Sequence, residues 1–462
     1  MSGFPRVAIG SLGNHPSPSP IVWALAGYLT QQGRQVRHFF SRACYCSLQG
    51  ALTTTGMASR YMDSWLTSRD ECRAMLADSY RTSDFALFEG KFAVQASIQS
   101  TGVMAGEEQG GNLDELCRRL DLPRLIVLDA AQAVDCRIPS RPEAVDGVLV
   151  DGILEDAHFV RIQTCLEGAW GVPVVGGLRR NEAVRQRLAS LPPASVVPKE
   201  VCDLLIRSFG DFAQPALLEA ICRRATLPTA STRAEAVATL DLALRADNAP
   251  QPTVAVAYDD AFCGYFADML EFLERHGAKV VDFSPLHDEV LPEHTDVALF
   301  GCGRPDVHAE ALAANHCMMS SLRSFARRGG RVYAEGGGLA YLGRTLRAVD
   351  GVSHAMTNLL PVSSRRCFEH VAPEPMEFAV EADNWLLPVG ESLRAYRSRH
   401  WNFEVLEPAA EVLAGSAIDP ELLRSGNVVG GRLQMHLSAQ PALLRGFFQT
   451  PAAVPGQVAA VG

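Results

Sequence analysis

Short apolar runs recur along the chain, each followed by a stretch long enough for a helix. Six lie in the first half and are uninterrupted rather than alternating, as expected of strands buried on both faces of a parallel sheet. They are residues 6–10, 34–40, 84–90, 124–130, 146–154 and 172–178. In the segment after the first run, apolar residues fall on one helical face at positions Ile21, Leu25, Tyr28 and Leu29.

The same succession of apolar runs and helix-length stretches restarts near residue 253. Its apolar runs lie at 253–258, 278–283, 296–303 and 331–337. The polar, proline-containing stretch "RADNAPQP" before it is typical of a linker. The pattern predicts an α/β protein of two doubly wound domains with mainly parallel sheets. We place the domains at residues 1–247 and 248–450, followed by a loose tail at 451–462.

Composition and charge narrow the class of protein. The chain has 462 residues, 47% of them hydrophobic, and no run approaches the ~20 apolar residues of a membrane span. Its N-terminus lacks the pattern of a signal peptide, so we expect a cytoplasmic protein that does not act on membranes. The net charge of −10 argues against nucleic-acid binding. The 12 cysteines are scattered, and Cys44 and Cys46, the one close pair, predict no metal site without a second pair.

The segment after the first strand has the position, but not the chemistry, of a phosphate-binding loop. It reads "GSLGNHPSPSPIVWALAGYL" and contains no lysine, while Pro16, Pro18 and Pro20 each remove a backbone N–H donor. Its serines remain able to bind a polar group, and Pro20 is suited to begin a helix. We therefore favour a structural loop over an ATP site.

Carboxylates end two of the predicted strands. Glu89, followed by Gly90, lies in "FEGKF", and Asp129 lies in "VLDA". Ligands and Mg2+ bind at the carboxyl ends of such strands, so both side chains are candidate ligands. A solvated carboxylate at the start of a loop explains them equally well.

In the second half, "RVYAEGGGLAYLG" predicts a strand, a tight turn and a helix, the arrangement that presents an activated nucleophile in several enzyme families. The nucleophile position is Gly336, which has no side chain, so covalent catalysis there is excluded. Gly301 and Gly303, just after another strand, could supply oxyanion-binding N–H groups or could simply form a turn. Neither Cys302 nor Cys317 lies at the elbow, so we expect neither to replace the missing thiol.

The order of these motifs resembles the cobyrinate a,c-diamide synthase family over nearly the whole chain. The resemblance is strongest in "VAVAYDDAFCGYF", "DFSPLHDEVLP", "GCGRPDVHAEALAAN" and "VYAEGGGLAYLG", and looser in "SRYMDSWL", "FEGKF", "LIVLDA" and "GVLVDGILEDAHFVRIQ". It implies a P-loop-NTPase-like domain similar to dethiobiotin synthetase, then a class I glutamine amidotransferase domain with a flavodoxin-like fold. Such enzymes use ATP to activate acetate carboxylates of a corrin-type tetrapyrrole, and ammonia from glutamine forms the amide.

The chain departs from the family at functional positions. The Gly-Lys-Ser/Thr phosphate signature corresponds to Ser17, Pro18 and Ser19, and the amidotransferase cysteine to Gly336. A family aspartate corresponds to Cys44 and a strand-end asparagine to Asp151, which joins Glu89 and Asp129 as a candidate ligand for Mg2+ or substrate. The catalytic histidine corresponds to Gln434 or, after a small alignment shift, to His436; a structural role is favoured for His436 and for His400. The residues that remain as in the family are Glu89, Gly90, Gly301, Gly303 and Gly337, the last three being oxyanion-type positions.

These departures favour a non-catalytic relative that lacks its own glutaminase and the usual ATP loop. Such a protein would bind a tetrapyrrole-like molecule as a carrier, scaffold or accessory to a partner enzyme of tetrapyrrole metabolism, with no cofactor of its own. The alternative is an active amide ligase that uses ATP, Mg2+ and free or partner-supplied ammonia. A third hypothesis keeps only the fold and assigns a different ligand. A homodimer is compatible with each.

Overall fold

The computed structural model describes residues 4–12, 17–43, 48–93, 110–131, 138–191, 195–224, 251–367, 373–387, 389–390, 392–406, 410–416, 419–436 and 446–448. The chain divides into two compact units, Met1–Ala238 and Thr239–Gly462. The domain boundary predicted at residues 247 and 248 and the predicted tail lie outside the described residues. None of the helices in the described ranges combines the length and apolar character needed to cross a bilayer.

The first unit is built on a seven-stranded sheet in the order β3-β2-β4-β1-β5-β6-β7, with every neighbouring pair parallel. All six strands predicted from apolar runs are present, and the two-residue β3 is the addition. The bounds are β1 Arg6–Leu12, β2 Val36–Phe40, β3 Arg60–Tyr61, β4 Phe85–Phe92, β5 Arg124–Asp129, β6 Gly147–Ile153 and β7 Val174–Arg179.

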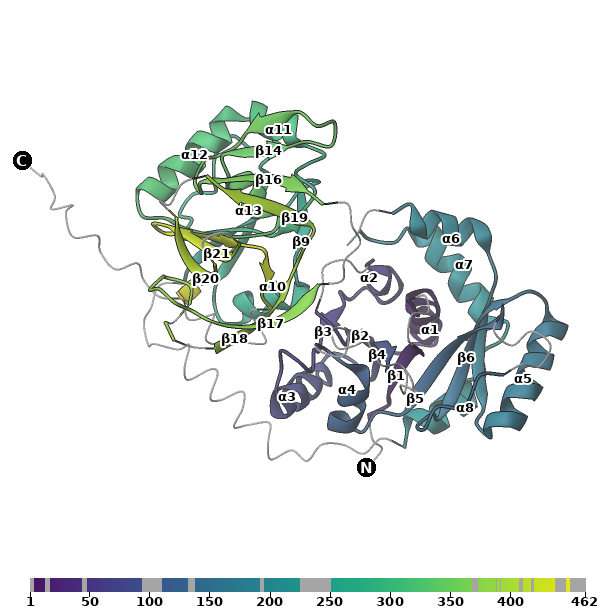
Figure 1. The fold of residues 1–462 in the computed structure, drawn as a ribbon. Helices are drawn as coiled ribbons and strands as arrows, with labels where there is room; N and C mark the ends of the chain where they lie inside the picture. Colours follow the sequence, from purple (N-terminus) through teal and green to yellow (C-terminus); the bar gives the residue numbers. More distant parts are fainter. Residues whose placement is uncertain are drawn as a thin grey trace, which may run out of the picture. The chain divides into compact units, whose positions relative to one another are not determined.

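Helices cover both faces of this sheet (Figure 1). Along β1, Val7 and Ile9 belong to the core beneath α1, α7 and α8, whereas Ala8 belongs to the opposite core beneath α3, α4 and α5. This two-sided burial explains the uninterrupted apolar runs. The helices are α1 Ser19–Gln31, α2 Gly50–Thr55, α3 Arg69–Ser79, α4 Leu113–Leu120, α5 Asp156–Trp170, α6 Glu182–Ala189, α7 Lys199–Gly210 and α8 Pro215–Cys222.

Helix α1 is buried on nearly all sides because α7 packs along it. A Cβ added at Gly27 would lie 2.3 Å from Ile206 Cδ1, so this close approach requires glycine. The start of α1 lies beside β4, where Ser19 reaches Glu89.

The second unit has a seven-stranded sheet in the order β10-β8-β11-β13-β22-β21-β20. The first five strands are parallel and follow the flavodoxin-type order 2-1-3-4-5. At one edge, β21 pairs antiparallel with β22, and β20 pairs antiparallel with β21. The predicted mainly parallel α/β architecture is thus confirmed. The bounds are β8 Thr253–Ala257, β10 Lys279–Phe283, β11 Val297–Phe300, β13 Arg331–Glu335, β20 Glu411–Gly415, β21 Pro420–Ser425 and β22 Val428–Gly431.

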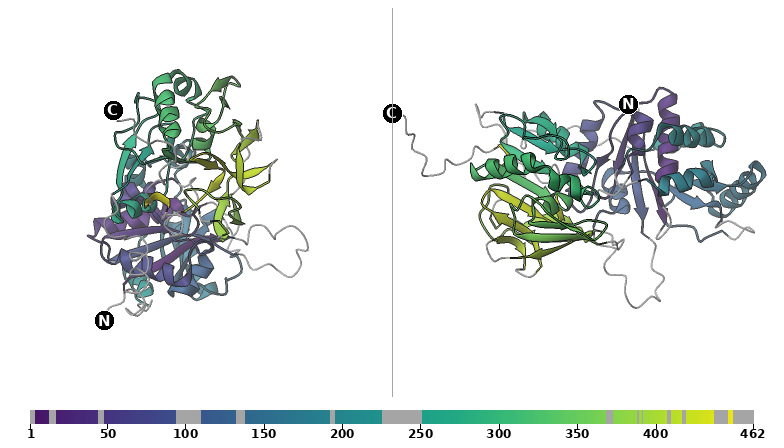
Figure 2. Two further views of the ribbon diagram at one scale, coloured as in Figure 1. Left: turned by 90° about the vertical axis from the view of Figure 1, so that its left-hand side faces the viewer. Right: turned by 90° about the horizontal axis from the view of Figure 1, so that it is seen from above.

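Small sheets and further helices complete the described part of this unit, drawn in green to yellow in Figure 2. The small sheets pair β12 with β9, β14 with β15 and β16, β16 with β19, and β18 with β17 and β23. The helices are α10 Ala267–Arg275, α11 Ala309–Ala314, α12 His316–Arg327 and α13 Gly337–Leu342. The small strands are β9 Phe262–Gly264, β12 Cys302–Gly303, β14 Thr345–Arg347, β15 Ser353–Ala355, β16 Val362–Arg366, β17 Glu374–Ala379, β18 Ser392–Arg397, β19 Trp401–Val405 and β23 Leu433–Gln434.

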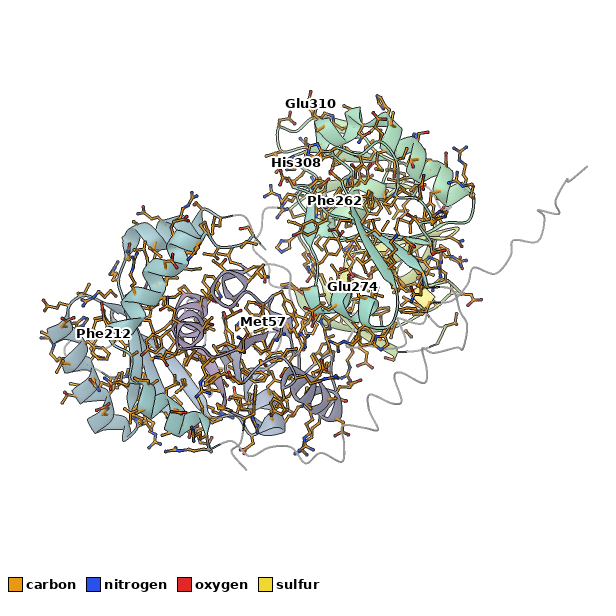
Figure 3. The ribbon with its side chains drawn as sticks, turned by 180° about the vertical axis from the view of Figure 1, so that it is seen from behind. Met57, Phe212, Phe262, Glu274, His308 and Glu310 are labelled. Atoms are coloured by element: carbon orange, nitrogen blue, oxygen red, sulfur yellow. The ribbon has the colours of Figure 1, made fainter. Side chains whose placement is uncertain are left out.

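Aromatic packing fixes the segments that follow the central strands of the second sheet. Phe262, labelled in Figure 3, is fully buried, and its ring centroid lies 5.8 Å from that of Phe300 and 5.5 Å from that of Tyr341. These rings come from β9, the end of β11 and α13. Because β11, β13 and β22 are parallel, the segments that follow them meet at one edge of the sheet.

Candidate functional site

At the start of α1, the described residues offer a phosphate neither a lysine nor an N–H from Pro18 or Pro20. Pro18 is the N-cap residue and makes no side-chain capping bond, and its carbonyl accepts the N–H groups of Ile21 and Val22 at 3.1 Å. Pro20 occupies the first turn and donates no N–H. Pro16 lies outside the described residues.

The serines of this loop are bound to a buried carboxylate. Ser17 Oγ lies 2.6 Å from Ser19 Oγ and donates to Glu89 Oε1 at 3.3 Å, and Ser19 Oγ donates to the same oxygen. On its other side, Glu89 Oε2 lies 3.0 Å from His38 Nε2, and His38 Nδ1 lies 2.9 Å from Ser59 Oγ. Glu89, His38 and Ser59 are each at most 3% exposed.

This network changes what the loop can bind. In a phosphate site the loop would present hydrogen-bond donors and a cation to the anion, whereas here its hydroxyl groups donate to a protein carboxylate. The described residues therefore do not fit a triphosphate at this place. His38 and Ser59 were missed by sequence reasoning, although a histidine inside the apolar strand "VRHFF" was a usable signal.

Asp129 and Asp151 lie side by side at the ends of the paired strands β5 and β6. Asp129 Oδ1 accepts the N–H of Ala131 at 2.9 Å, and Asp151 Oδ2 accepts a hydrogen bond from Arg185 Nη2 at 2.9 Å. Burial raises the pKa of Asp151, and the charge of Asp129 adds to the rise while Arg185 opposes it. Asp151 is thus partnered within the unit.

Among the described residues, no group of three or more His, Cys, Asp or Glu side chains is arranged to hold a metal ion. The roles of Glu89, Asp129 and Asp151 as ligands stay predictions. Cys44, the position of the family aspartate, lies outside the described residues, as does Cys46.

The predicted strand–turn–helix in the second unit is present. β13 ends at Glu335, Gly336 has φ +52° and ψ −106°, and α13 begins at Gly337. The N–H of Gly336 donates to the carbonyl of Gly431 at 2.9 Å, which ties the elbow to the neighbouring strand β22. A positive φ of this kind is strained for any residue with a Cβ.

A thiol from another strand fills the place beside this glycine. A Cβ at Gly336 would lie 3.1 Å from Cys302 Sγ and 3.6 Å from Trp401 Cδ1. Cys302 thus comes close to the elbow, which its position in the sequence did not predict; the expectation that it does not replace the missing thiol stays a prediction. The contact arises because β11 and β13 are adjacent parallel strands, so the residues that follow them lie close together in space. Cys317 lies exposed on α12.

The surroundings of Cys302 keep its thiol neutral. Burial raises the pKa of Cys302 well above its ordinary value, and the charge of Glu335 raises it further. The amide of Gln434 and the backbone of Gly337 act on the pKa in the opposite direction but more weakly. Glu335 is itself held by Tyr333 Oη and by the N–H of Met435.

Of the two candidates for the family histidine, Gln434 is the one beside the thiol. Gln434 Nε2 lies 4.0 Å from Cys302 Sγ, and the side chain is 4% exposed. His436 Nε2 instead lies 3.0 Å from Asp268 Oδ2, and its ring packs against Phe266. His400 is half-buried, and its carbonyl accepts the N–H of Cys367.

The three predicted oxyanion glycines gather here. The N–H of Gly301 donates to Tyr265 Oη at 2.8 Å, so this donor is already used. A Cβ at Gly303 would lie 1.9 Å from the carbonyl oxygen of Ala261, and one at Gly337 would lie 3.0 Å from the backbone of Gly303. The glycines thus allow backbone-to-backbone packing, and their oxyanion role stays a prediction.

Comparison with known proteins confirms the predicted resemblance. Residues 253–374 match the model of the CobB/CobQ-like glutamine amidotransferase domain. The cobyrinate a,c-diamide synthase of Salmonella typhimurium is 28% identical over 416 residues, which cover 84% of this chain and 86% of that protein. The enzyme of the same name from Dehalococcoides mccartyi strain CBDB1 is 26% identical, with 96% and 98% covered.

Solved structures resemble the units only weakly. A glutamine amidotransferase matches 42% of this chain and 96% of its own at 21% identity, with a TM-score of 0.33. The 54 kDa signal recognition particle protein of Aeropyrum pernix, in complex with GDP, matches 53% of this chain and 52% of its own at 12% identity and a TM-score of 0.27. Scores this low support no functional argument.

Proposed function

We propose that this protein binds a tetrapyrrole carboxylate as an accessory or carrier protein and does not carry out ATP-dependent amide ligation. The chain resembles cobyrinate a,c-diamide synthases along most of its length, which supports a ligand of the class those enzymes act on. In this proposal the protein also has no glutaminase centred on residue 336, since glycine offers no nucleophile.

One observation supports the proposed loss of the ATP-dependent step. Ser17 and Ser19, at the start of α1, donate to the buried carboxylate of Glu89. A triphosphate entering this loop would meet a carboxylate, and the loop sequence contains no lysine to offset its charge. Repulsion between these anions disfavours binding.

The test is a pair of measurements on the full chain. We expect an absorbance titration with cobyrinate to saturate, and ATP hydrolysis to stay at background with cobyrinate, Mg2+ and ammonium present. ATP hydrolysis that requires cobyrinate and is stimulated by ammonium would replace this proposal with the amide ligase hypothesis. A titration without an absorbance change or saturation would reject tetrapyrrole binding.

A further inference from the structure

The thiol of Cys302 occupies the space into which a side chain at position 336 would extend. Its Sγ lies 3.1 Å from the Cβ position of Gly336. The residue retains partial solvent exposure. A thiol in this place faces the same surroundings that a side chain from the elbow would face.

A second observation points to a ligand at this thiol. Gln434 is 96% buried, and its Oε1 has no hydrogen-bond partner among the described residues. The other end of the same amide lies 4.0 Å from Cys302 Sγ. A buried carbonyl oxygen without a donor is unfavourable, and an N–H group of a bound molecule would satisfy it.

These groups are complementary to a primary carboxamide. Gln434 Oε1 can accept from the NH2 group of the ligand, and the N–H of Gly337 can donate to the ligand's carbonyl once the sulfur bonds to carbon. A carboxylic acid or ester lacks the NH2 donor that Gln434 requires. The second unit matches a glutamine amidotransferase model, so the side-chain amide of glutamine is the primary carboxamide to test.

We propose that Cys302 is the nucleophile of the second unit and attacks the side-chain carboxamide of glutamine. The sulfur bonds to the amide carbon, the carbon–nitrogen bond breaks, and ammonia leaves with the proton of the thiol. Water then hydrolyses the thioester, which releases glutamate and restores the thiol. The reaction is slow, because Gln434 cannot take the thiol proton as an imidazole can.

Gln434 acts in this proposal as a positioning residue for the carboxamide. It goes beyond the proposed function, which concerns the first unit and a tetrapyrrole, and it does not depend on either. The test of this proposal therefore measures covalent labelling of Cys302, which is expected whether or not a tetrapyrrole binds.

The experiment treats the full chain with a glutamine analogue carrying a chloromethyl ketone at the γ position, and with iodoacetamide in parallel. Mass spectrometry compares labelling of Cys302 with that of the exposed Cys317. We expect the analogue to label Cys302 faster than Cys317 and iodoacetamide to reverse that order, since the neutral thiol of Cys302 has little intrinsic reactivity. Excess glutamine should slow only the labelling of Cys302 by the analogue.

Two variants separate nucleophile from positioning residue. Gln434→Leu removes the acceptor and should slow labelling of Cys302 by the analogue about ten-fold, the effect of one hydrogen bond, with iodoacetamide labelling unchanged. Gln434→His should raise glutamate release from glutamine, and Cys302→Ser in that background should abolish it. The proposal fails if Cys317 reacts with the analogue as fast as Cys302, or if Cys302 is labelled only after denaturation.

Discussion

Each unit contains one site at which we propose a departure from the family motif, and the structure fills the two sites in different ways. At the start of α1, the loop serines turn to Glu89, a carboxylate of the same unit. At the elbow after β13, the absent side chain of Gly336 is matched by a thiol that Cys302 brings from the end of a neighbouring strand. In the first site the polar side chains form hydrogen bonds with one another, whereas the second site contains a thiol.

This difference leads us to treat the loss of a motif residue and the loss of chemistry as separate hypotheses. The hydroxyls and the carboxylate in the first unit use their hydrogen-bonding capacity on one another, so they have little left for a ligand. In the second unit, Cys302 lies near the amide nitrogen of Gln434, whose amide oxygen has no partner among the described residues. The first site is therefore expected to matter most for stability, and the second for reactivity.

The largest effect is expected from Glu89→Ala. The change leaves His38, Ser17 and Ser19 without their shared acceptor in a buried place, and we expect a loss of about 3–5 kcal/mol in unfolding free energy. Urea denaturation followed by circular dichroism measures it. Glu89→Gln keeps an oxygen acceptor and should cost only about 1–2 kcal/mol. Equal stability of wild type and Glu89→Ala would contradict the idea of a satisfied network.

A smaller effect is expected from Gly336→Ala, at about 1–3 kcal/mol, because the new Cβ meets both a positive φ and Cys302 Sγ. Gly426→Ala is the matched control, since Gly426 has φ +57° but nothing within 4 Å of its Cβ position. Combining Gly336→Ala with Cys302→Ala should recover at least about 0.5 kcal/mol of the loss, as residues in contact couple. Strict additivity in this denaturation cycle would show that the two sites do not touch.

The smallest effect is a pH dependence of stability carried by Cys302. Its pKa is raised in the folded state, so the folded protein binds the thiol proton more tightly than the unfolded chain does. The resulting stabilisation is complete below the ordinary thiol pKa of about 8.5 and is lost as pH rises above it. Denaturation midpoints of wild type should therefore fall more steeply above that pH than those of Cys302→Ala. Parallel curves would indicate a thiol with an ordinary pKa.

Sequence patterns were a good guide to the main sheets and a poor guide to side-chain contacts. All ten apolar runs form strands, because burial on both faces leaves a direct record in the sequence. Strands β20, β21 and β22 of the second sheet and the strands of the small sheets were not predicted. Several of these strands, such as β16 and β18, are short and partly exposed. The elbow at Gly336 and the gathering of Gly301, Gly303 and Gly337 followed from the motifs.

The sequence by itself determined that position 336 has no nucleophile, that the loop before α1 has no lysine, and that two mainly parallel sheets form. Each of these depends only on which residue stands where, or on local apolar content. Only the tertiary structure decided that Cys302 lies at Gly336, that Gln434 rather than His436 lies beside that thiol, and that Ser17 and Ser19 are bound to Glu89. Such contacts join residues that are distant in sequence, and parallel strand order, which no local pattern encodes, brings their ends together.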